Sequence, residues 1–417
     1  MNYTAGDFIL KKLNLILRSN ERIDISRLFV DIQLNEDIFS NTIRGVLTIN
    51  DHTDLLSSAP LLGEETIELE CYTPGIEDAK HYINHKFQIY KISDRVRVSA
   101  DSQLYNIHFA STEYLINELN KISTYLSGNP ADSILKIFVG EQYLNSKSLL
   151  HIPELPENNL TIATPFWTPF KIINWLAARS IRADSKTADY LFFETLTRGY
   201  QYIPITKLIE SGENVIKYGD SGVGVNSNGY DIDRDYSTIR SLYVDEVFDF
   251  IKKAQTGYYS SRLMTANVLT KSLASSNLKQ FEYFDKYPHL NEKNPVRGDT
   301  TTSKNSAMYS FINQEYTFDN QRDLNFNSWF LQRINYFSGL TNTYRINIVV
   351  PGRFDVGIGR MVEIDKELVR QHNENENYHN QIIDNSSGRF LISAVNHILT
   401  AGGRHSMTLE CITDSLK

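Results

Sequence analysis

The chain has 417 residues, of which 41% are hydrophobic, 22% charged and 12% aromatic, and it carries a formal net charge of −8. This length exceeds what one hydrophobic core usually serves, so the sequence predicts two to four domains. The acidic balance argues against a dedicated nucleic-acid binder, because no basic region is available to neutralise phosphates.

The N-terminal stretch, MNYTAGDFILKKLNLILRSNE, does not have the layout of a secretory signal. Asp7 precedes the apolar run, and Lys11 and Lys12 interrupt it. No apolar run approaches the length of a membrane span, so we expect no membrane insertion. The sequence therefore predicts a soluble protein that is made in a cytosol.

Residues 1–112 are predicted to form a first β-barrel (tube-like) domain. Short runs between residues 23 and 110 alternate apolar with polar side chains, as in IDISRLFVDIQL, TIELECY and LYNIHFA. Polar breaks such as NEDIFSN and TPGIED separate these runs, which is typical of antiparallel strands. A series of short strands of this kind favours a sandwich or a barrel.

Residues 113–235 are predicted to form a mixed α/β segment with capped helices. The run STEYLINELNKI indicates a helix capped at its first or second residue. In NPADSILKIFVG, Asn129 is the expected N-cap, Pro130 takes the first helical position, and Gly140 ends the helix. TPFKIINWLAARSI begins in the same way with Thr and Pro. A loop rich in Gly, Asn, Ser and Asp at 211–236 indicates a boundary.

The next stretch mixes strand, helix and loop signals. IRSLYVDEVFDFIKKAQTG predicts a strand that runs into a helix ended by Gly257, and YSSRLMTANVLTKSL favours a strand. Residues 286–308 are polar and are expected to form a loop. SWFLQRINYFSG predicts a helix that is capped by Asn327 or Ser328 and ended by Gly339.

The last strands of the chain repeat those of the first domain. The matched stretches are NTIRGVLTIN at 41–50 with NTYRINIVVP at 342–351, GEETIELE with GRMVEID, HKFQIYKI with GRFLISAV, and YNIHFAST with MTLECITD. They follow the same order, at offsets of about 301, 295, 303 and 302. Convergent strand patterns are the alternative, but four collinear matches at a nearly constant offset favour an internal duplication.

The duplication places the second β-barrel domain at residues 236–280 and 336–417. Residues 281–335 are then a polar loop and helix insertion. The predicted fold class is α+β, mainly β, with two similar antiparallel β-barrel domains and mixed helical segments inserted between them.

The histidines were natural candidates for a metal site. Three spaced pairs occur: His81 with His85, His372 with His379, and His397 with His405. The first pair lies in a strand pattern and lacks the Glu of a zinc protease, the second lies in a polar run, and the third flanks a turn. All six are predicted to be solvated surface side chains.

The acidic residues do not form a catalytic pattern either. DIDRD at 231–235 begins like a calcium loop, but Leu242 stands where the bidentate Glu belongs. Glu68 and Glu70 share one face of a strand about 7 Å apart, a separation that glycosidases use and that a solvated strand face also produces. We predict no catalytic, cofactor-binding or metal-binding residues, no cofactor, and no enzymatic activity.

Cys71 and Cys411 are the only cysteines. Two cysteines in a chain of this length do not make a disulfide framework. Each lies in an alternating strand pattern, which predicts a buried free thiol. The two could pair only if their strands meet, which the sequence leaves open.

A tandem pair of similar domains has a specific geometric use. If three copies of the chain associate, six similar domains can form a ring with pseudo-sixfold symmetry. Such a trimer could join a threefold body to a sixfold one.

The chain resembles the central baseplate hub proteins of contractile-tailed, T-even-like bacteriophages, which are related to the hub part of type VI secretion spike proteins. The resemblance is carried by VDIQLNEDIFSNTIRGVLTINDHTDLLSSAPLLGEETIELECYTPG at 30–75, by HKFQIYKISDRVRV and LYNIHFASTEYL, and by PFWTPFKIINWLA. GRMVEID and GRFLISAVNHILTAGGRHSMTLECI resemble the second barrel. The likeness covers most of residues 20–200 and 236–417.

The resemblance implies a homotrimeric hollow ring in the baseplate of the virion tail, assembled in the host cytoplasm. Its partners would be a spike or tail lysozyme protein, the tail tube protein and the baseplate wedge proteins, with DNA only passing through during ejection. No spike repeat follows the second barrel, so a separate protein would supply the point. An acidic channel lining would repel DNA phosphates. A tail-associated glycan-binding protein or peptidoglycan hydrolase is the alternative.

Overall fold

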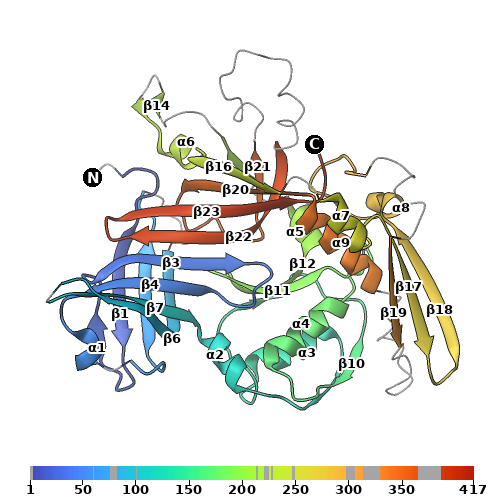
Figure 1. The fold of residues 1–417 in the computed structure, drawn as a ribbon, viewed down its shortest axis with the longest axis horizontal. Helices are drawn as coiled ribbons and strands as arrows, with labels where there is room; N and C mark the ends of the chain where they lie inside the picture. Colours follow the sequence, from blue (N-terminus) through green and yellow to red (C-terminus); the bar gives the residue numbers. More distant parts are fainter. Residues whose placement is uncertain are drawn as a thin grey trace.

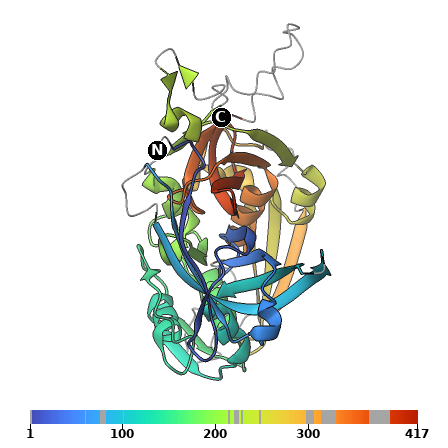
Figure 2. The same ribbon diagram turned by 90° about the vertical axis from the view of Figure 1, so that its left-hand side faces the viewer.

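We describe the fold from a computed structural model. It describes residues 3–59, 61–75, 82–99, 101–212, 215–219, 225–226, 229–246, 249–296, 306–312, 329–364 and 387–417. His81, His372, His379, Asn327 and Ser328 lie outside the described residues. The C-terminus lies in the upper part of the molecule in Figures 1 and 2.

One large, mostly antiparallel sheet dominates the fold (Figure 1). Its N-terminal strands are β1 (Ile9–Ile16), β2 (Arg22–Asp24), β3 (Phe29–Asp37), β4 (Arg44–Asp51), β5 (Thr66–Tyr72), β6 (Tyr82–Arg97) and β7 (Gln103–Ser111). Its later strands are β13 (Ile216–Tyr218), β16 (Ser241–Glu246), β20 (Tyr344–Pro351), β21 (Met361–Ile364), β22 (Gly388–Thr400) and β23 (Arg404–Thr413). The strand order is β16-β20-β23-β22-β3-β4-β7-β6-β5-β1-β2, and β21 and β13 extend from β22.

The alternation seen in the sequence decides which face of each strand is buried. In β4, Leu47 and Ile49 are fully buried, whereas Thr48 between them is partly exposed. In β20, Ile348 and Val350 are likewise fully buried. Burial of one such side chain contributes about 1.5–3 kcal/mol. The N-terminal strands, called here the first strand set, and the later strands, called the second, each cover their own apolar cluster. The prediction of a mainly β chain is confirmed.

The two strand sets repeat the same order of pairing. β4-β7-β6-β5 in the first set matches β20-β23-β22-β21 in the second. Equivalent residue pairs are Leu47–Ile107 and Ile348–Leu409, Gln88–Ala110 and Leu391–Ile412, and Thr66–Gln88 and Met361–Leu391. These pairs reproduce the offsets of the sequence matches. A β-bulge also recurs at the equivalent place, between Ile89 and Lys91 and between Ile392 and Ala394.

The strands do not separate into two closed barrels within the described part of the chain. Instead, β22 pairs with β3, so the two strand sets merge into one open sheet. This contact joins residues about 360 positions apart, such as Glu36 and His397. Pairing over such distances is invisible in local sequence patterns.

The mixed segment lies against one side of this sheet (Figure 1). Its helices are α2 (Thr112–Leu119), α3 (Pro130–Val139), α4 (Pro169–Arg179) and α5 (Ile205–Ser211). Its strands are β8 (Tyr125–Gly128), β9 (Leu150–His151), β10 (Leu160–Ala163), β11 (Tyr190–Thr195) and β12 (Gly199–Pro204). Asn129 Oδ1 accepts a hydrogen bond from the Ala131 N–H at 2.9 Å, and Gly140 is the C-cap of α3. The three predicted helices of this segment are confirmed.

Short elements complete the described fold. They are α1 (Leu55–Ser58), β14 (Val225–Asn226), β15 (Gly229–Tyr230), α6 (Ile232–Tyr236), α7 (Phe250–Gln255), β17 (Ser260–Asn267), β18 (Ser272–Lys279), α8 (Gln280–Tyr283), a 3-10 turn (Phe284–Lys286), β19 (Ala307–Ile312) and α9 (Phe330–Asn342). The predicted strand and helix before Gly257 are confirmed as β16 and α7. None of the helices in the described residues is both long and apolar enough to cross a membrane.

The helix α9 corrects one prediction. It has Trp329 at its N-cap and continues past Gly339 to Asn342. Gly339 does not end the helix, because its role is close packing. A Cβ at this position would lie 2.8 Å from the Tyr258 ring, so only glycine allows the helix and the ring to approach this closely.

Candidate assembly site

The contact between β22 and β3 is the place where the two strand sets meet. Pairing runs antiparallel from Ala394 opposite Asp37 to Thr400 opposite Asp31. β22 first pairs with β21 through residues 388–391, and then the bulge turns its edge toward β3. The bulge therefore lets one long strand serve two neighbours in succession.

Three polar side chains lie buried across this junction. Glu36, His397 and His405 are each at most 2% exposed. His397 Nε2 lies 3.0 Å from Glu36 Oε1, and His397 Nδ1 lies 3.0 Å from His405 Nε2. Glu36 Oε2 accepts a hydrogen bond from the Leu196 N–H at 2.9 Å. The network thus ties β3, β22, β23 and the β11–β12 turn together.

The prediction that His397 and His405 are solvated is therefore wrong. The turn between them is exposed, but the alternation of the flanking strands points both rings inward. Burial, followed by the nearby His397, lowers the pKa of His405 well below its ordinary value. The His405 ring also stacks on Phe354 at a centroid distance of 4.5 Å.

Glycines let the backbone close over the His405 ring. The Gly352 N–H donates to the His405 carbonyl at 2.8 Å, and the His405 N–H donates to the Gly6 carbonyl at 2.6 Å. A Cβ on Gly352 would lie 2.1 Å from the ring of His405. The junction is therefore packed too closely for any larger residue at position 352.

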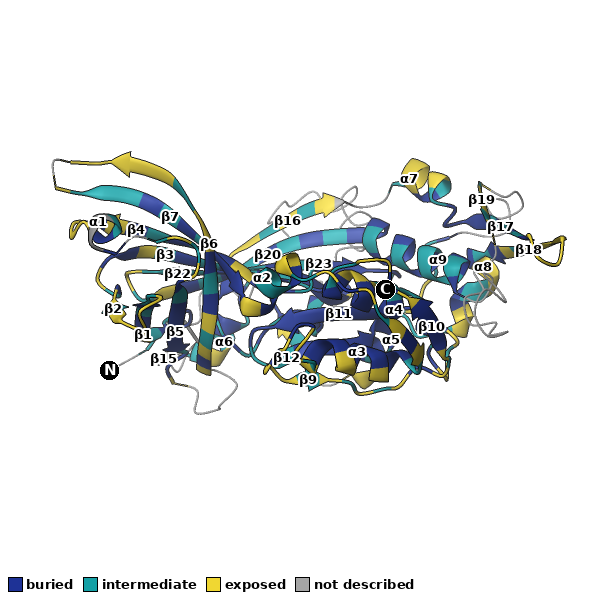
Figure 3. Ribbon diagram, turned by 90° about the horizontal axis from the view of Figure 1, so that it is seen from below, coloured by how far each residue is buried: buried dark blue, intermediate teal, exposed yellow. Residues whose placement is uncertain are grey.

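The strands that the repeat makes equivalent to β22 and β3 have free edges in the described structure. β6 is the equivalent of β22, and it leaves β5 after residue 88 at the same bulge. β16 is the equivalent of β3, and among the described strands it pairs with β20 alone. In the described chain, no strand pairs with the outer edge of residues 91–97 or with the far edge of β16. Figure 3 shows the outer half of β6 and the end of β16 as largely exposed.

Large apolar side chains are exposed at these two edges. Val96 is 57% exposed and Val98 63%, at the end of β6. Tyr243, in the middle of β16, is 62% exposed. Unpaired strand edges that carry apolar side chains are ready templates for pairing with another chain.

The face of the large sheet opposite the core, called here the open face, is polar and close to neutral. It carries mainly amides and hydroxyls: Asn35, Thr48, Asn106, Asn347, Asn396 and Thr408. Its charged members have both signs and include Asp31, Asp37, Glu410, Arg44, Arg345, Lys91 and Arg404. Arg345 lies 3.8 Å from Glu410, so part of this charge is paired.

The carboxylates that the sequence raised as candidates are engaged in local contacts. Lys12 Nζ lies 2.5 Å from Glu70, and Arg22 lies 3.5 Å from Glu68. Both glutamates are covered by these neighbours rather than solvated. Asp231 caps α6 by accepting from the backbone N–H groups of residues 233 and 234.

His85, Cys71 and Cys411 were also considered from the sequence. His85 is half-buried, and its Nε2 lies 2.5 Å from the Leu196 carbonyl oxygen. Cys71 and Cys411 are free and buried, which confirms the prediction. Within the described residues, no three His, Cys, Asp or Glu side chains gather closely enough to hold a metal ion.

Among the buried glutamates that the sequence patterns did not single out, two join distant strands. Glu36 continues the inward positions of Ile32 and Leu34, and that alternation could have identified it. Glu194 accepts from the Ile43 N–H and from the Ser111 hydroxyl, and burial raises its pKa to about 8. It joins the first strand set to β11.

The comparisons with known proteins agree on the fold. The tail protein from Neisseria meningitidis MC58 matches at a TM-score of 0.56 and 9% identity, over 98% of this chain and 97% of that one. The 43 kDa tail protein of prophage MuSo2 from Shewanella oneidensis matches at 0.54 and 9%, over 97% and 99%. No protein-family model and no curated sequence matches. The chain has the fold of phage tail proteins, which confirms the resemblance at the level of the fold.

Proposed function

We propose that this protein is the structural hub of a phage tail baseplate. It is a homotrimeric hollow ring that adapts a threefold cell-puncturing spike to a sixfold tail tube and lets DNA pass during ejection. The fold shared with phage tail proteins supports a structural role in the tail. One observation supports the ring itself. Within the chain, β22 pairs with β3, and the equivalents of these two strands, β6 and β16, have free edges in the described structure.

The repeat of strand order, register and bulge supports an internal duplication. In this proposal residues 1–112 form the first tube-like domain, and residues 236–280 with 336–417 form the second. Residues 113–235 and 281–335 are segments added between and around them. Two domains of one origin can make the same contact twice, once within a chain and once between chains.

The contact between chains follows from the contact within the chain. Because β6 corresponds to β22 and β16 to β3, the outer edge of residues 91–97 in one copy pairs antiparallel with β16 of the next. The contact is head-to-tail, so it closes into a ring when the rotation per copy is right. It also covers both unpaired strand edges described above.

The register of this contact can be derived position by position. Val96 faces Leu104 as Ile398 faces Ser406, and Tyr243 faces Asn347 as Gln33 faces Val46. Within the chain, Ile398 lies opposite Gln33. Val96 of one copy therefore lies opposite Tyr243 of the next, so the exposed apolar side chains of the two edges meet.

The open face of the sheet would line the channel of the ring. Each copy contributes β16, β20, β23, β22, β3, β4, β7 and β6 to a continuous wall. Its amides and hydroxyls replace the acidic lining suggested by composition. Such a lining offers few uncompensated cations, so DNA phosphates are not held during passage.

The remaining parts of the proposal concern partners and place. The ring would meet a spike or tail lysozyme protein on one side, the tail tube protein on the other, and the baseplate wedge proteins around it. It would act in the baseplate of a contractile tail, after assembly in the host cytoplasm. No catalytic step, cofactor or metal is part of this function.

Disulfide trapping tests the proposed contact. In the double variant Val96→Cys, Tyr243→Cys, oxidation should link three chains into a closed ring that runs as a covalent trimer on a non-reducing gel. Directly opposed positions of antiparallel strands lie about 4.5–5.5 Å apart, within the reach of a disulfide.

The matched control moves one partner by one residue. Leu242 neighbours Tyr243 but packs on the core cluster, so Val96→Cys with Leu242→Cys should not cross-link. Each single variant should stay uncrosslinked as well. Equal cross-linking of the two pairs, or none in the first, would contradict the proposed register.

A further inference from the structure

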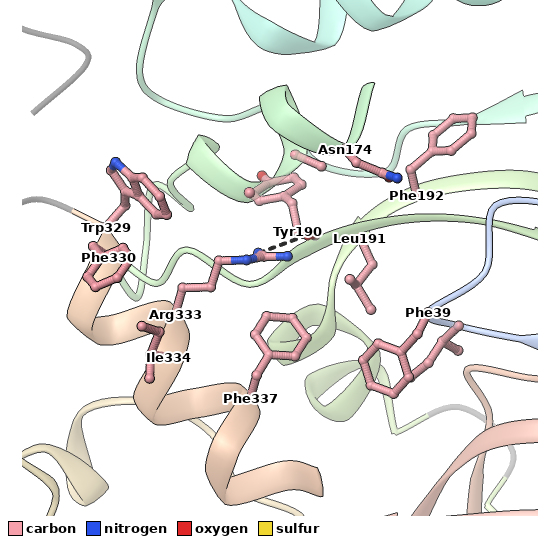
Figure 4. A pocket seen from close by; sticks show the side chains of 13 residues that line it. Phe39, Asn174, Tyr190, Leu191, Phe192, Trp329, Phe330, Arg333, Ile334 and Phe337 are labelled. Atoms are coloured by element: carbon pink, nitrogen blue, oxygen red, sulfur yellow. Dashed lines mark hydrogen bonds between the residues drawn. The ribbon is translucent and has the colours of Figure 1, made fainter. Parts of the chain in front are cut away.

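A cavity of about 460 Å³ lies between α4, β11 and α9 (Figure 4). Its apolar wall includes Phe39, Leu191, Phe330, Ile334 and Phe337. Phe39 stands at its edge and is 45% exposed. The cavity is open to solvent on one side and large enough for one or two amino-acid residues.

A guanidinium group projects into this apolar cavity. The Arg333 side chain extends from α9, and Nη1 donates to the carbonyl oxygens of Ala188 at 2.9 Å and Tyr190 at 3.2 Å (Figure 4). Its Cζ lies 4.4 Å from the centre of the Phe337 ring. These contacts hold the group in place but leave its Nε and Nη2 donors without a partner in the described residues.

A second guanidinium lies behind the cavity wall. Arg179, on α4, stacks over Trp175 at 4.0 Å and over Trp329 at 4.6 Å. Its Nη1 donates to the Trp175 carbonyl oxygen at 3.2 Å. Trp329 belongs to the cavity wall, so the charge of Arg179 acts on the cavity across this ring.

Neither charge is neutralised within the part of the chain that the structure describes. Among the described residues, no carboxylate lies within ion-pair distance of Arg179 or Arg333. Burial and then the charge of Arg333 lower the pKa of Arg179 to about 10. Burial lowers the pKa of Arg333 to about 10 as well, although Asp189 opposes the effect. The Asp189 carboxylate is already engaged by Thr187 and the Thr206 N–H.

A nearby arginine shows the usual arrangement. Arg182 is buried and is neutralised by Glu154 at 2.8 Å and by Glu210. Arg182 thus differs from Arg179 and Arg333, for which no such carboxylate partner occurs among the described residues. The first turn of α9, which lines the cavity, adds the positive end of the helix dipole and has no side-chain cap. The cavity combines an apolar wall with positive charge that no described carboxylate neutralises.

We propose that this cavity binds the C-terminal residue of a partner polypeptide that ends in a large apolar side chain. The terminal carboxylate pairs with Arg333 and lies in the field of Arg179, and the side chain packs against Phe39, Leu191 and Phe337. A C-terminal residue is the simplest peptide group that carries a carboxylate next to an apolar side chain. Guanidinium groups recognise carboxylates through paired N–H donors, and an anion here relieves the repulsion between the two arginines.

The test uses a small probe and its neutral counterpart on the full chain. N-acetyl-phenylalanine carries the free carboxylate, and N-acetyl-phenylalaninamide lacks it. Trp175 and Trp329 flank Arg179, so tryptophan fluorescence reports on occupancy. We expect the acid to change the emission with saturation below ~20 mM, and the amide to bind about tenfold more weakly.

Variants separate the two arginines from the surrounding fold. Arg179→Gln and Arg333→Gln should each weaken binding of the acid about tenfold. Arg333→Gln also releases two backbone carbonyls, whereas Arg179→Gln loses only a hydrogen bond within its own helix. Lys171→Gln removes a cation of the same helix, stacked on Trp167 at 4.7 Å, and should leave binding unchanged.

Three results would overturn the proposal. They are equal binding of acid and amide, no saturable signal from the acid, and binding of inorganic phosphate as tight as that of the acid. The outcome does not depend on the oligomeric state, since every group involved belongs to one chain. Failure of the ring proposal would leave this site untouched, and the reverse holds too.

Discussion

The buried network at the β22–β3 junction makes a quantitative prediction for Glu36→Ala. The change removes the acceptor of the Leu196 N–H and the partner of His397 Nε2, each at about 3 Å and each buried. A buried polar group left without its partner costs about 1–3 kcal/mol. Two such groups together give a loss of about 2–6 kcal/mol in the free energy of unfolding.

Two further variants sharpen this experiment. Glu36→Gln keeps one carbonyl oxygen and can satisfy one of the two groups, so we expect roughly half of the loss, about 1–3 kcal/mol. Glu64→Ala removes a glutamate whose contact with Arg18 is exposed, and it should change stability by less than about 0.5 kcal/mol.

The assay is urea unfolding at neutral pH, followed by circular dichroism at one fixed protein concentration. The expected order of loss is Glu36→Ala, then Glu36→Gln, then Glu64→Ala. If Glu36→Ala lost less than about 1 kcal/mol, the junction would not depend on this carboxylate and the reasoning would be refuted.

Three further predictions concern buried groups and close packing. The pKa of His405 is lowered in the folded state, so its contribution to stability is present above about pH 6.5 and is lost as the pH falls below this value. In His405→Asn, the urea midpoint of unfolding should therefore change less with pH in this range. Glu194 has a pKa raised from 4.5 to about 8, so its contribution is lost as the pH rises between these values; Glu194→Gln should remove that loss, and an unchanged pH profile would contradict the assignment. Gly352→Ala places a methyl 2.1 Å from the His405 ring and should cost about 1–3 kcal/mol, whereas Gly402→Ala meets no atom within 4 Å and should cost far less; equal effects in thermal unfolding would argue against the packing.

Local patterns in the sequence predict much of the secondary structure, and the reason is physical. Asn129, Pro130 and Gly140 bound α3 because a cap, a fixed φ and a stop act within a few residues. The four matched pairs of strands are also predicted correctly, because period-2 alternation depends only on the two faces of a single strand.

The features that the sequence does not predict depend on contacts between distant segments. The merging of the two strand sets rests on pairing of β22 with β3. The buried state of His397 and His405 rests on Glu36, and the continuation of α9 past Gly339 rests on the Tyr258 ring. The side chains that flank a polar turn can be solvated or buried, and a glycine can end a helix or allow close packing. Only the contacts with distant segments decide between these outcomes.

The mass of the purified chain in solution, measured alone and then with the candidate spike protein, tests the ring most directly. Three chains of 47.9 kDa make 143.7 kDa. The hub proposal predicts this mass in at least one of the two conditions, with a pseudo-sixfold projection in electron micrographs. A strict monomer in both conditions would leave β6 and β16 without partners and would contradict the ring.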